Sequence, residues 1–271
     1  MRRFKRLFKV KKPVIGMIHL DSLPGTPNFK GKTSTIIERA VEEAKVYLGA
    51  GIDSIAIENM HDLPYLKREV GHEISSIMSI VGYEIKRATK LPTGIQILAG
   101  ANKEALAAAN SAGLDFIRAE GFIYSHIADE GSIESDAGEL LRYRKIIGAE
   151  NILIFTDIKK KHSSHTITAD IGIEDTALTA EFFMSDGVVI TGKSTGSPAD
   201  IHQLESVKKR VKLPVIVGSG VTIENVMEYY PVCDALIIGS TFKKGGNWRK
   251  EVDKIRVGNF MRKMRELREQ I

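Results

Sequence analysis

Cysteine is almost absent from this 271-residue chain, which contains only Cys233. A single cysteine excludes an internal disulfide framework. Chains of this kind are expected in a reducing compartment, so the sequence predicts a cytoplasmic protein. Cys233 lies beside an apolar run, and we expect it to be a small core residue.

Long apolar runs and base-stacking patterns are missing as well. No segment is long and apolar enough to span a bilayer, and Met1–Phe8 lacks the apolar centre of a secretory signal. Aromatic residues make up 7% of the chain and are not interleaved with basic residues as they are in proteins that stack nucleic-acid bases. The sequence therefore predicts neither membrane insertion nor nucleic-acid binding.

Acidic residues are absent from residues 1–12, a segment rich in lysine and arginine. Over the whole chain 39 basic residues face 34 acidic ones, and the segment Lys250–Arg268 adds further positive charge near the other end. Basic ends contact nucleic acid or a membrane in some proteins, but solvated helix ends are the more common explanation. We interpret residues 1–12 as a basic extension.

What the chain does contain is a regular alternation of apolar runs and amphipathic segments. Thr33–Leu48, for example, places its apolar residues on one helical face. Eight apolar runs rich in Val and Ile are expected to be strands: Pro13–Leu20, Ser54–Glu58, Gly94–Leu98, Phe116–Glu120, Ile152–Asp157, Gly187–Thr191, Val215–Gly218 and Ala235–Gly239. A doubly wound open sheet uses the same alternation, but eight repeats favour a closed α/β barrel, the (β/α)8 or TIM barrel. We expect one domain over residues 1–271.

Two glycine-rich segments follow the last two expected strands. The first contains Gly218, Ser219 and Gly220, and the second contains Gly239 and Ser240. Backbone N–H groups at such turns bind anions, and (β/α)8 barrels hold substrate phosphates at this place. The paired segments predict a phosphate-binding site.

Polar residues gather at the carboxyl ends of the other strands, the functional face of a barrel. The candidates for catalysis are His19, Glu58, Asp157, Lys161 and His162. The candidates for substrate binding are Asp21, Asn59, Arg118, Thr191, Thr195 and Gly196. Acids, histidines and lysines on one rim support proton transfer, carbonyl chemistry or a divalent metal.

Several of these candidates have a structural alternative. Glu58 and Arg118 are equally well explained as an ion pair across the barrel mouth, and His19 as a hydrogen-bonded core residue. Lys161 is a potential Schiff-base lysine, but it belongs to a run of three lysines, a pattern more typical of a solvated surface. The spacing of His162 and His165 allows a zinc site, which we do not favour because the segment reads as a loop. Magnesium held through Asp157 or Glu58 is the metal that the pattern allows, and no cofactor is required by it.

Taken together, these motifs are more specific than any one of them, and nearly the whole chain resembles the BtpA/SgcQ family. The resemblance rests on Ile15–Leu20 with Leu23–Gly25, Gly51–Asp53, Ile57–Asn59, Asp62–Pro64, Phe116–Arg118, Asp157 with Lys161 and His162, Ile190–Gly192, Thr195 with Gly196, and Gly218–Thr222 with Asn225. It implies a TIM barrel of the ribulose-phosphate-binding type. Relatives are associated with photosystem I biogenesis or stability and with carbohydrate metabolism.

The chain departs from the family pattern at two places. Met60 and His61 replace an aromatic residue and a glycine, and Leu98–Asn102 replaces a stretch with a cation and an acid. The second difference indicates that the substrate of relatives need not be the substrate here.

These observations predict a cytoplasmic, homo-oligomeric enzyme that acts on a small phosphorylated sugar or nucleoside-like metabolite. Isomerase, lyase and hydrolase chemistry all use this set of residues. The competing hypothesis is a non-catalytic assembly or stability factor that has kept the barrel as a scaffold. That hypothesis predicts a protein partner bound through an exposed apolar patch.

Overall fold

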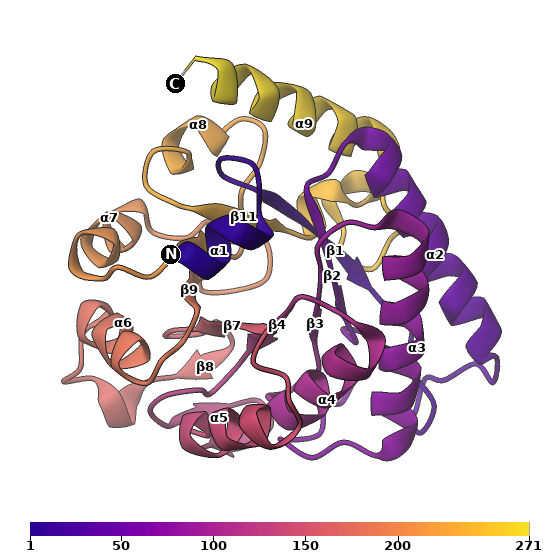
Figure 1. Ribbon diagram of the computed structural model, residues 1–271, viewed down its shortest axis with the longest axis horizontal. Coiled ribbons are helices and arrows are strands. Elements are labelled where there is room, and N and C mark those ends of the chain that lie inside the picture. Colours follow the sequence, from indigo (N-terminus) through magenta and orange to yellow (C-terminus); the bar gives the residue numbers. More distant parts are fainter. Residues whose placement is uncertain (271) are drawn as a thin grey trace.

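Eight parallel strands close into a barrel in the computed structural model, which describes residues 1–270 (Figure 1). Around the barrel the strands follow one another as β1 (Val14–His19), β2 (Ser54–Glu58), β3 (Thr93–Gln96), β4 (Phe116–Ala119), β7 (Leu153–Asp157), β9 (Gly187–Ile190), β10 (Val215–Val217) and β11 (Ala235–Ile238). Residue pairing is in register between β1 and β2 from Ile15–Ser54 to His19–Glu58, which sets His19 beside Glu58 at the mouth. The predicted TIM barrel and all eight predicted strands are confirmed.

Helices cover the outside of the barrel (Figure 1). They are α2 (Thr33–Ala50), α3 (His72–Thr89), α4 (Asn102–Ala112), α5 (Ala137–Ile146), α6 (Ile173–Phe182), α7 (Ile201–Arg210), α8 (Val226–Tyr229) and α9 (Lys254–Glu269). Gly51 directly follows α2 and Gly113 directly follows α4, both in the left-handed conformation that turns the chain back toward the next strand. Cys233 is fully buried in the core, as predicted.

The amino-terminal segment differs from the solvated basic extension that we expected. Residues Arg2–Leu7 form helix α1, which crosses the centre of the barrel in Figure 1. Phe4 and Phe8 are only 5% and 4% exposed. Their rings pack against those of Phe116 and Phe155 inside the barrel, with Phe4–Phe155 and Phe8–Phe116 centroids 6.0 Å apart. The segment therefore closes the amino-terminal end of the barrel with the rings of Phe4 and Phe8, while its basic residues stay outside this apolar cluster.

A second, three-stranded sheet lies in the loops beyond β4 and β7. It consists of β5 (His126–Ala128), β6 (Gly131–Ile133) and β8 (Ser163–Ser164), with β5 between the other two. The turn between β5 and β6 brings Asp129 and Glu130 to the cavity at the barrel mouth. These strands are too short for the sequence pattern to have predicted them.

Another segment that shapes the mouth follows β11. A 3-10 turn, η2 (Ser240–Phe242), leads to Lys243, whose side chain is 1% exposed and ion-paired with Glu43 of α2 at 2.8 Å. The pair fixes the base of the loop that carries Trp248. Within residues 1–270, no helix is sufficiently long and apolar to cross a membrane.

Candidate functional site

Two adjoining pockets occupy the carboxyl-terminal mouth of the barrel, and we treat them as the two parts of one cavity because five residues line both. The smaller part, of about 40 Å³, lies between the exits of β1, β10 and β11, and the larger part, of about 340 Å³, extends toward β3 and β4. Glu58, Met60, Arg118, Lys161 and Thr195 line both parts. A ligand that fills the cavity would therefore contact the glycine-rich exits and the ionisable residues at once.

The smaller part is the predicted phosphate site, and we call its wall of Gly218–Gly220 and Gly239–Ser240 the glycine cup. The backbone N–H groups of Ser219, Gly220 and Ser240 donate no hydrogen bond to any residue from 1 to 270. Unpaired amides that converge on a small cavity form an anion-binding concavity. The cup therefore offers unpaired backbone donors to an anion.

Gly220 is the position of the cup where a side chain is least compatible with the fold. Its φ of +68° lies in the left-handed region, and a Cβ there would lie 2.3 Å from the backbone nitrogen of Pro198. The Ser219 hydroxyl donates to the Ser197 carbonyl at 3.0 Å and accepts from the Gly192 amide at 2.8 Å. The side chain of Ser219 thus holds the 192–198 loop against the cup and leaves its backbone amide for an anion.

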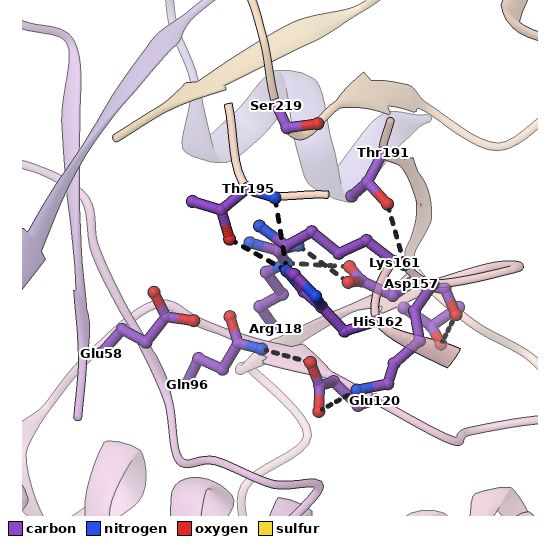
Figure 2. Close-up of polar contacts among 12 residues, drawn as sticks. Glu58, Gln96, Arg118, Glu120, Asp157, Lys161, His162, Thr191, Thr195 and Ser219 are labelled. Atoms are coloured by element: carbon purple, nitrogen blue, oxygen red, sulfur yellow. Dashed lines mark hydrogen bonds and ion pairs between the residues drawn. The ribbon is translucent and has the colours of Figure 1, made fainter. Parts of the chain in front are cut away.

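Arg118 and Asp157 form a two-pronged ion pair at the centre of the site (Figure 2). The Nε–Oδ1 and Nη2–Oδ2 distances are both 2.8 Å, and the side chains are 7% and 1% exposed. A buried carboxylate of this kind requires a cation, and Arg118 supplies it. The sequence had suggested Glu58 as the partner of Arg118, and the structure shows Asp157 instead. The contacts fit Asp157 for orienting Arg118.

His19 and Glu58 meet on the neighbouring side of the mouth, with Nε2 and Oε2 3.6 Å apart. His19 Nδ1 lies 3.1 Å from the Trp248 carbonyl, which can only accept, so the proton is on Nδ1 and Nε2 is unprotonated. Burial, reinforced by the charge of Lys243, lowers the pKa of His19 to about 3. Burial raises the pKa of Glu58, against the opposing charges of Arg118 and Lys161. The contact is therefore one between a neutral imidazole and a carboxyl group that retains its proton to higher pH than usual.

Acid is expected to destabilise the protein through His19. Because the folded-state pKa is about 3 and the ordinary value is 6.5, the unfolded chain binds more protons in this interval. The free energy of unfolding then falls as the pH falls from 6.5 toward 3, by up to several kcal/mol. Urea unfolding at neutral pH and at about pH 4 measures this drop in the free energy of unfolding. The drop should be smaller in His19→Gln than in the wild type, and in His202→Gln, at an exposed site, it should equal that of the wild type. Equal losses in wild type and His19→Gln would contradict the assignment.

Lys161 projects into the cavity, and its backbone amide donates to Thr191 Oγ1 at 3.3 Å. His162 is exposed and contacts Thr195 Oγ1 through Nε2 at 3.1 Å. Thr191 thus holds the segment that carries Lys161 (Figure 2). Thr195 and Gly196 line the smaller part of the cavity.

Two of the residues expected to bind substrate lie elsewhere. Asp21 lines neither part of the cavity and is ion-paired with Arg39 at 2.9 Å. Asn59 is 1% exposed, donates to Asp62 at 2.8 Å and accepts from the Leu98 amide at 2.7 Å. Its side chain joins the loops after β2 and β3, so its polar groups are already used.

Three polar residues around Glu120 also belong to the site, although none of them was among the predicted site residues. Glu120 accepts from Gln96 Nε2 at 3.2 Å and is ion-paired with Lys160 at 3.3 Å, and all three line the larger part of the cavity. Gln96 Oε1 is buried and has no hydrogen-bond partner among residues 1–270. Gln96 and Glu120 stand at strand ends, and this position was the feature of the sequence that could have identified them. Trp248, which also lines this part, lies in a loop that no strand pattern marks.

The side chains do not form a metal site of the kind that the sequence allowed. Both Asp157 oxygens contact Arg118, and Glu58 contacts His19. Among the residues that the structure describes, no three His, Cys, Asp or Glu side chains come together in a metal-binding group. His165 Nε2 bonds to the Lys160 carbonyl at 3.0 Å, away from His162. These side chains therefore build no four-ligand zinc site, and the Asp157 and Glu58 oxygens expected for magnesium already contact protein partners.

Solved structures with little sequence similarity share this fold. Tryptophan synthase of Mycobacterium tuberculosis superposes with a TM-score of 0.61 at 13% identity, covering 97% of both chains. The (S)-3-O-geranylgeranylglyceryl phosphate synthase of Thermoplasma acidophilum, solved with sn-glycerol-1-phosphate, gives 0.59 at 17% identity, covering 97% of this chain and 96% of its own. The likeness shows the TIM-barrel fold.

Sequence relatives are much more similar. An uncharacterized mitochondrial protein of Caenorhabditis elegans is 45% identical over 97% of both chains. The photosystem I biogenesis protein BtpA of Synechocystis is 33% identical over 96% of this chain and 90% of its own. The family model described as the BtpA family matches residues 10–266. The chain therefore belongs to the BtpA family.

Proposed function

We propose that this protein is an enzyme that acts on a phosphorylated sugar or nucleoside-like metabolite. The observation that carries the proposal is that the unpaired amides of the glycine cup share one cavity with Glu58, Arg118 and Lys161. A phosphate in the cup would fix one end of a substrate and hold its reactive part against these groups. Solved neighbours named for phosphorylated molecules, such as the glyceryl phosphate synthase, support the same ligand class.

The ionisable groups fit distinct roles in proton transfer beside a carbonyl or hydroxyl group. Burial raises the pKa of Glu58, which suits this carboxyl group to donate a proton as well as accept one, and neutral His19 lies next to it. Arg118, held by Asp157, places a fixed positive charge where a developing oxyanion would be stabilised. Isomerase and lyase chemistry both use this combination.

A thermal-shift screen tests the ligand class. The panel contains inorganic phosphate, aldose and ketose phosphates and nucleoside monophosphates. A ligand present at about 100 times its dissociation constant adds about 2.7 kcal/mol to the free energy of unfolding, which gives a clear increase in Tm. No shift with any phosphorylated compound, from a protein that unfolds cooperatively, would contradict the proposal.

A negative charge in the cup should remove this shift. Ser240 is half-buried beside the unpaired amides, so Ser240→Asp is expected to abolish the stabilisation by phosphorylated ligands through charge repulsion. Ser76→Asp adds the same charge on an exposed position of α3 and should keep the full ligand-induced shift. An undiminished shift in Ser240→Asp would place the ligand elsewhere.

One feature favours the alternative of an assembly or stability factor, the role named for the Synechocystis relative. Ile146, Phe182 and Met184 are 79%, 82% and 66% exposed at the ends of α5 and α6. The Arg144–Asp186 ion pair, at 2.9 Å, brings these helix ends together. A partner protein that is captured stoichiometrically by the wild type and lost in Phe182→Asp, together with silence in the ligand screen, would favour this alternative.

We also infer a cytoplasmic location, self-association and no binding to nucleic acid. The name of the Caenorhabditis elegans relative places that protein in mitochondria. Cell fractionation and light scattering of the purified protein test the first two inferences. A nucleic-acid filter-binding assay at physiological salt tests the third.

A further inference from the structure

The three adjacent lysines after β7 have three different environments. Lys159 Nζ donates to the Thr168 carbonyl at 2.8 Å. Lys160 Nζ is paired with Glu120 at 3.3 Å. Lys161 is the member of the run whose ammonium group has no hydrogen bond or ion pair with any residue from 1 to 270. It lines both parts of the cavity.

The backbone of Lys161 is fixed while its side chain is free to react. Its amide is held by Thr191 Oγ1, and in Figure 2 the side chain lies beside the Arg118–Asp157 pair. The glycine cup is part of the same cavity wall. A phosphate bound in the cup therefore presents the rest of its molecule to Lys161.

The surroundings of Lys161 make its neutral amine more accessible than that of an ordinary lysine, because they lower its pKa. Burial, followed by the nearby charge of Arg118, lowers its pKa, and Glu58 and Asp157 oppose this only in part. Burial acts on Lys160 in the same direction, but Glu120 outweighs it and the pKa of Lys160 is raised. A neutral lysine amine is a nucleophile toward carbonyl groups, whereas an ammonium ion is not.

We propose that Lys161 forms an imine with the aldehyde or ketone group of a phosphorylated substrate, an inference that rests on the proposed function. The Nζ lone pair forms the bond to the carbonyl carbon. The carbonyl oxygen takes one proton from the attacking amine and one from the Glu58 carboxyl and leaves as water. The nitrogen keeps its second proton, so the product is a protonated imine facing the Glu58 carboxylate.

The larger part of the cavity points to a polyhydroxylated carbonyl compound. Gln96 Oε1 is a buried acceptor without a partner among residues 1–270, and Asp129 and Glu130 add acceptors in the same part of the cavity. Hydroxyl groups would satisfy these acceptors. An aldose or ketose phosphate combines the phosphate, the carbonyl and the hydroxyl groups that the cavity accommodates.

Pyridoxal 5′-phosphate is a suitable probe because it carries an aldehyde and a phosphate. The protein is incubated with the probe, reduced with sodium borohydride, and analysed by intact mass and peptide mapping. We expect one label per chain, on Lys161, with the imine absorbance visible before reduction. Excess inorganic phosphate should reduce labelling by at least about tenfold, and pyridoxal without the phosphate should label at least about tenfold more slowly.

Substitutions test whether the Lys161 amine itself carries the label. Lys161→Arg and Lys161→Met should lose the label and the absorbance, while Lys193→Met, at an exposed lysine of a nearby loop, should keep both. Lys161→Arg keeps a long basic side chain that cannot form an imine, and its thermal unfolding shows whether the fold is intact. Peptide mapping of the wild type needs no variant, so the proposal is testable even if both Lys161 variants fail to fold.

The outcomes distinguish the imine from the proposed function. Stabilisation by phosphorylated ligands with labelling spread over surface lysines would overturn the imine and leave the phosphate site intact. Equal labelling of Lys161 by both aldehydes, with no phosphate protection and no thermal shift, would support a reactive lysine and count against a phosphorylated substrate. Absence of any label on Lys161 overturns the inference.

Discussion

Replacing Arg118 by leucine is expected to lower the free energy of unfolding by about 3–5 kcal/mol. The substitution leaves Asp157, whose side chain is 1% exposed, without the cation that contacts both of its oxygens at 2.8 Å. An uncompensated carboxylate at this depth is costly even after it binds a proton. Urea unfolding of the purified variant at neutral pH measures the loss.

The matched control is the double variant Arg118→Leu/Asp157→Leu. Buried ion pairs are often replaceable by apolar residues at little cost, so the second substitution should recover much of the stability lost in the first. Ligand stabilisation should remain absent in both, because the fixed positive charge is gone. A double variant that loses the sum of the two single effects would show that the pair is not energetically coupled.

Removing the Phe8 ring is expected to cost about 3–5 kcal/mol, the range for a buried phenylalanine cut to alanine. Phe8 is 4% exposed and packs against Phe4, Phe116 and Phe155 at the closed end of the barrel. Phe8→Ala leaves a void in a cluster that neighbouring strands cannot collapse to fill. Thermal and urea unfolding of the variant measure the effect.

Phe182 provides the matched control for this prediction. Its ring is 82% exposed, so Phe182→Ala should change the free energy of unfolding by no more than about 0.5 kcal/mol. If Phe8→Ala is equally mild, then α1 does not plug the barrel in solution and residues 1–12 are the loose extension that their charge suggested.

The barrel could be predicted from the sequence because each strand carries its own signal. A buried parallel strand such as β10 or β11 is a short apolar run, and a glycine or polar residue marks its end. These signals are local, and eight of them point to closure. Helix α1 was missed for the same reason, since its two phenylalanines are separated by basic residues and their burial depends on rings contributed by β4 and β7.

The site was predictable in its location but less so in its pairings. Strand ends meet at one face of a barrel, so the sequence alone predicts that Glu58, Arg118 and Lys161 lie together. Which carboxylate pairs with Arg118 depends on side-chain direction across the barrel, and Asp157 proves to be the partner. Asn59 has the same kind of position in the sequence, yet its side chain is taken by backbone and loop contacts. Long-range geometry of this kind leaves no pattern along the chain.

The central claim is that the glycine cup binds the phosphate of a substrate, and amide NMR of the uniformly ¹⁵N-labelled protein tests it most directly. Inorganic phosphate is titrated in at constant ionic strength, with chloride as the control anion. The account predicts saturable shifts of the Ser219, Gly220 and Ser240 amides, which have no hydrogen-bond acceptor among residues 1–270. The Gly113 amide, in a left-handed turn at the end of α4, should remain unmoved. Shifts confined to other parts of the surface, or none that saturate, would contradict the account.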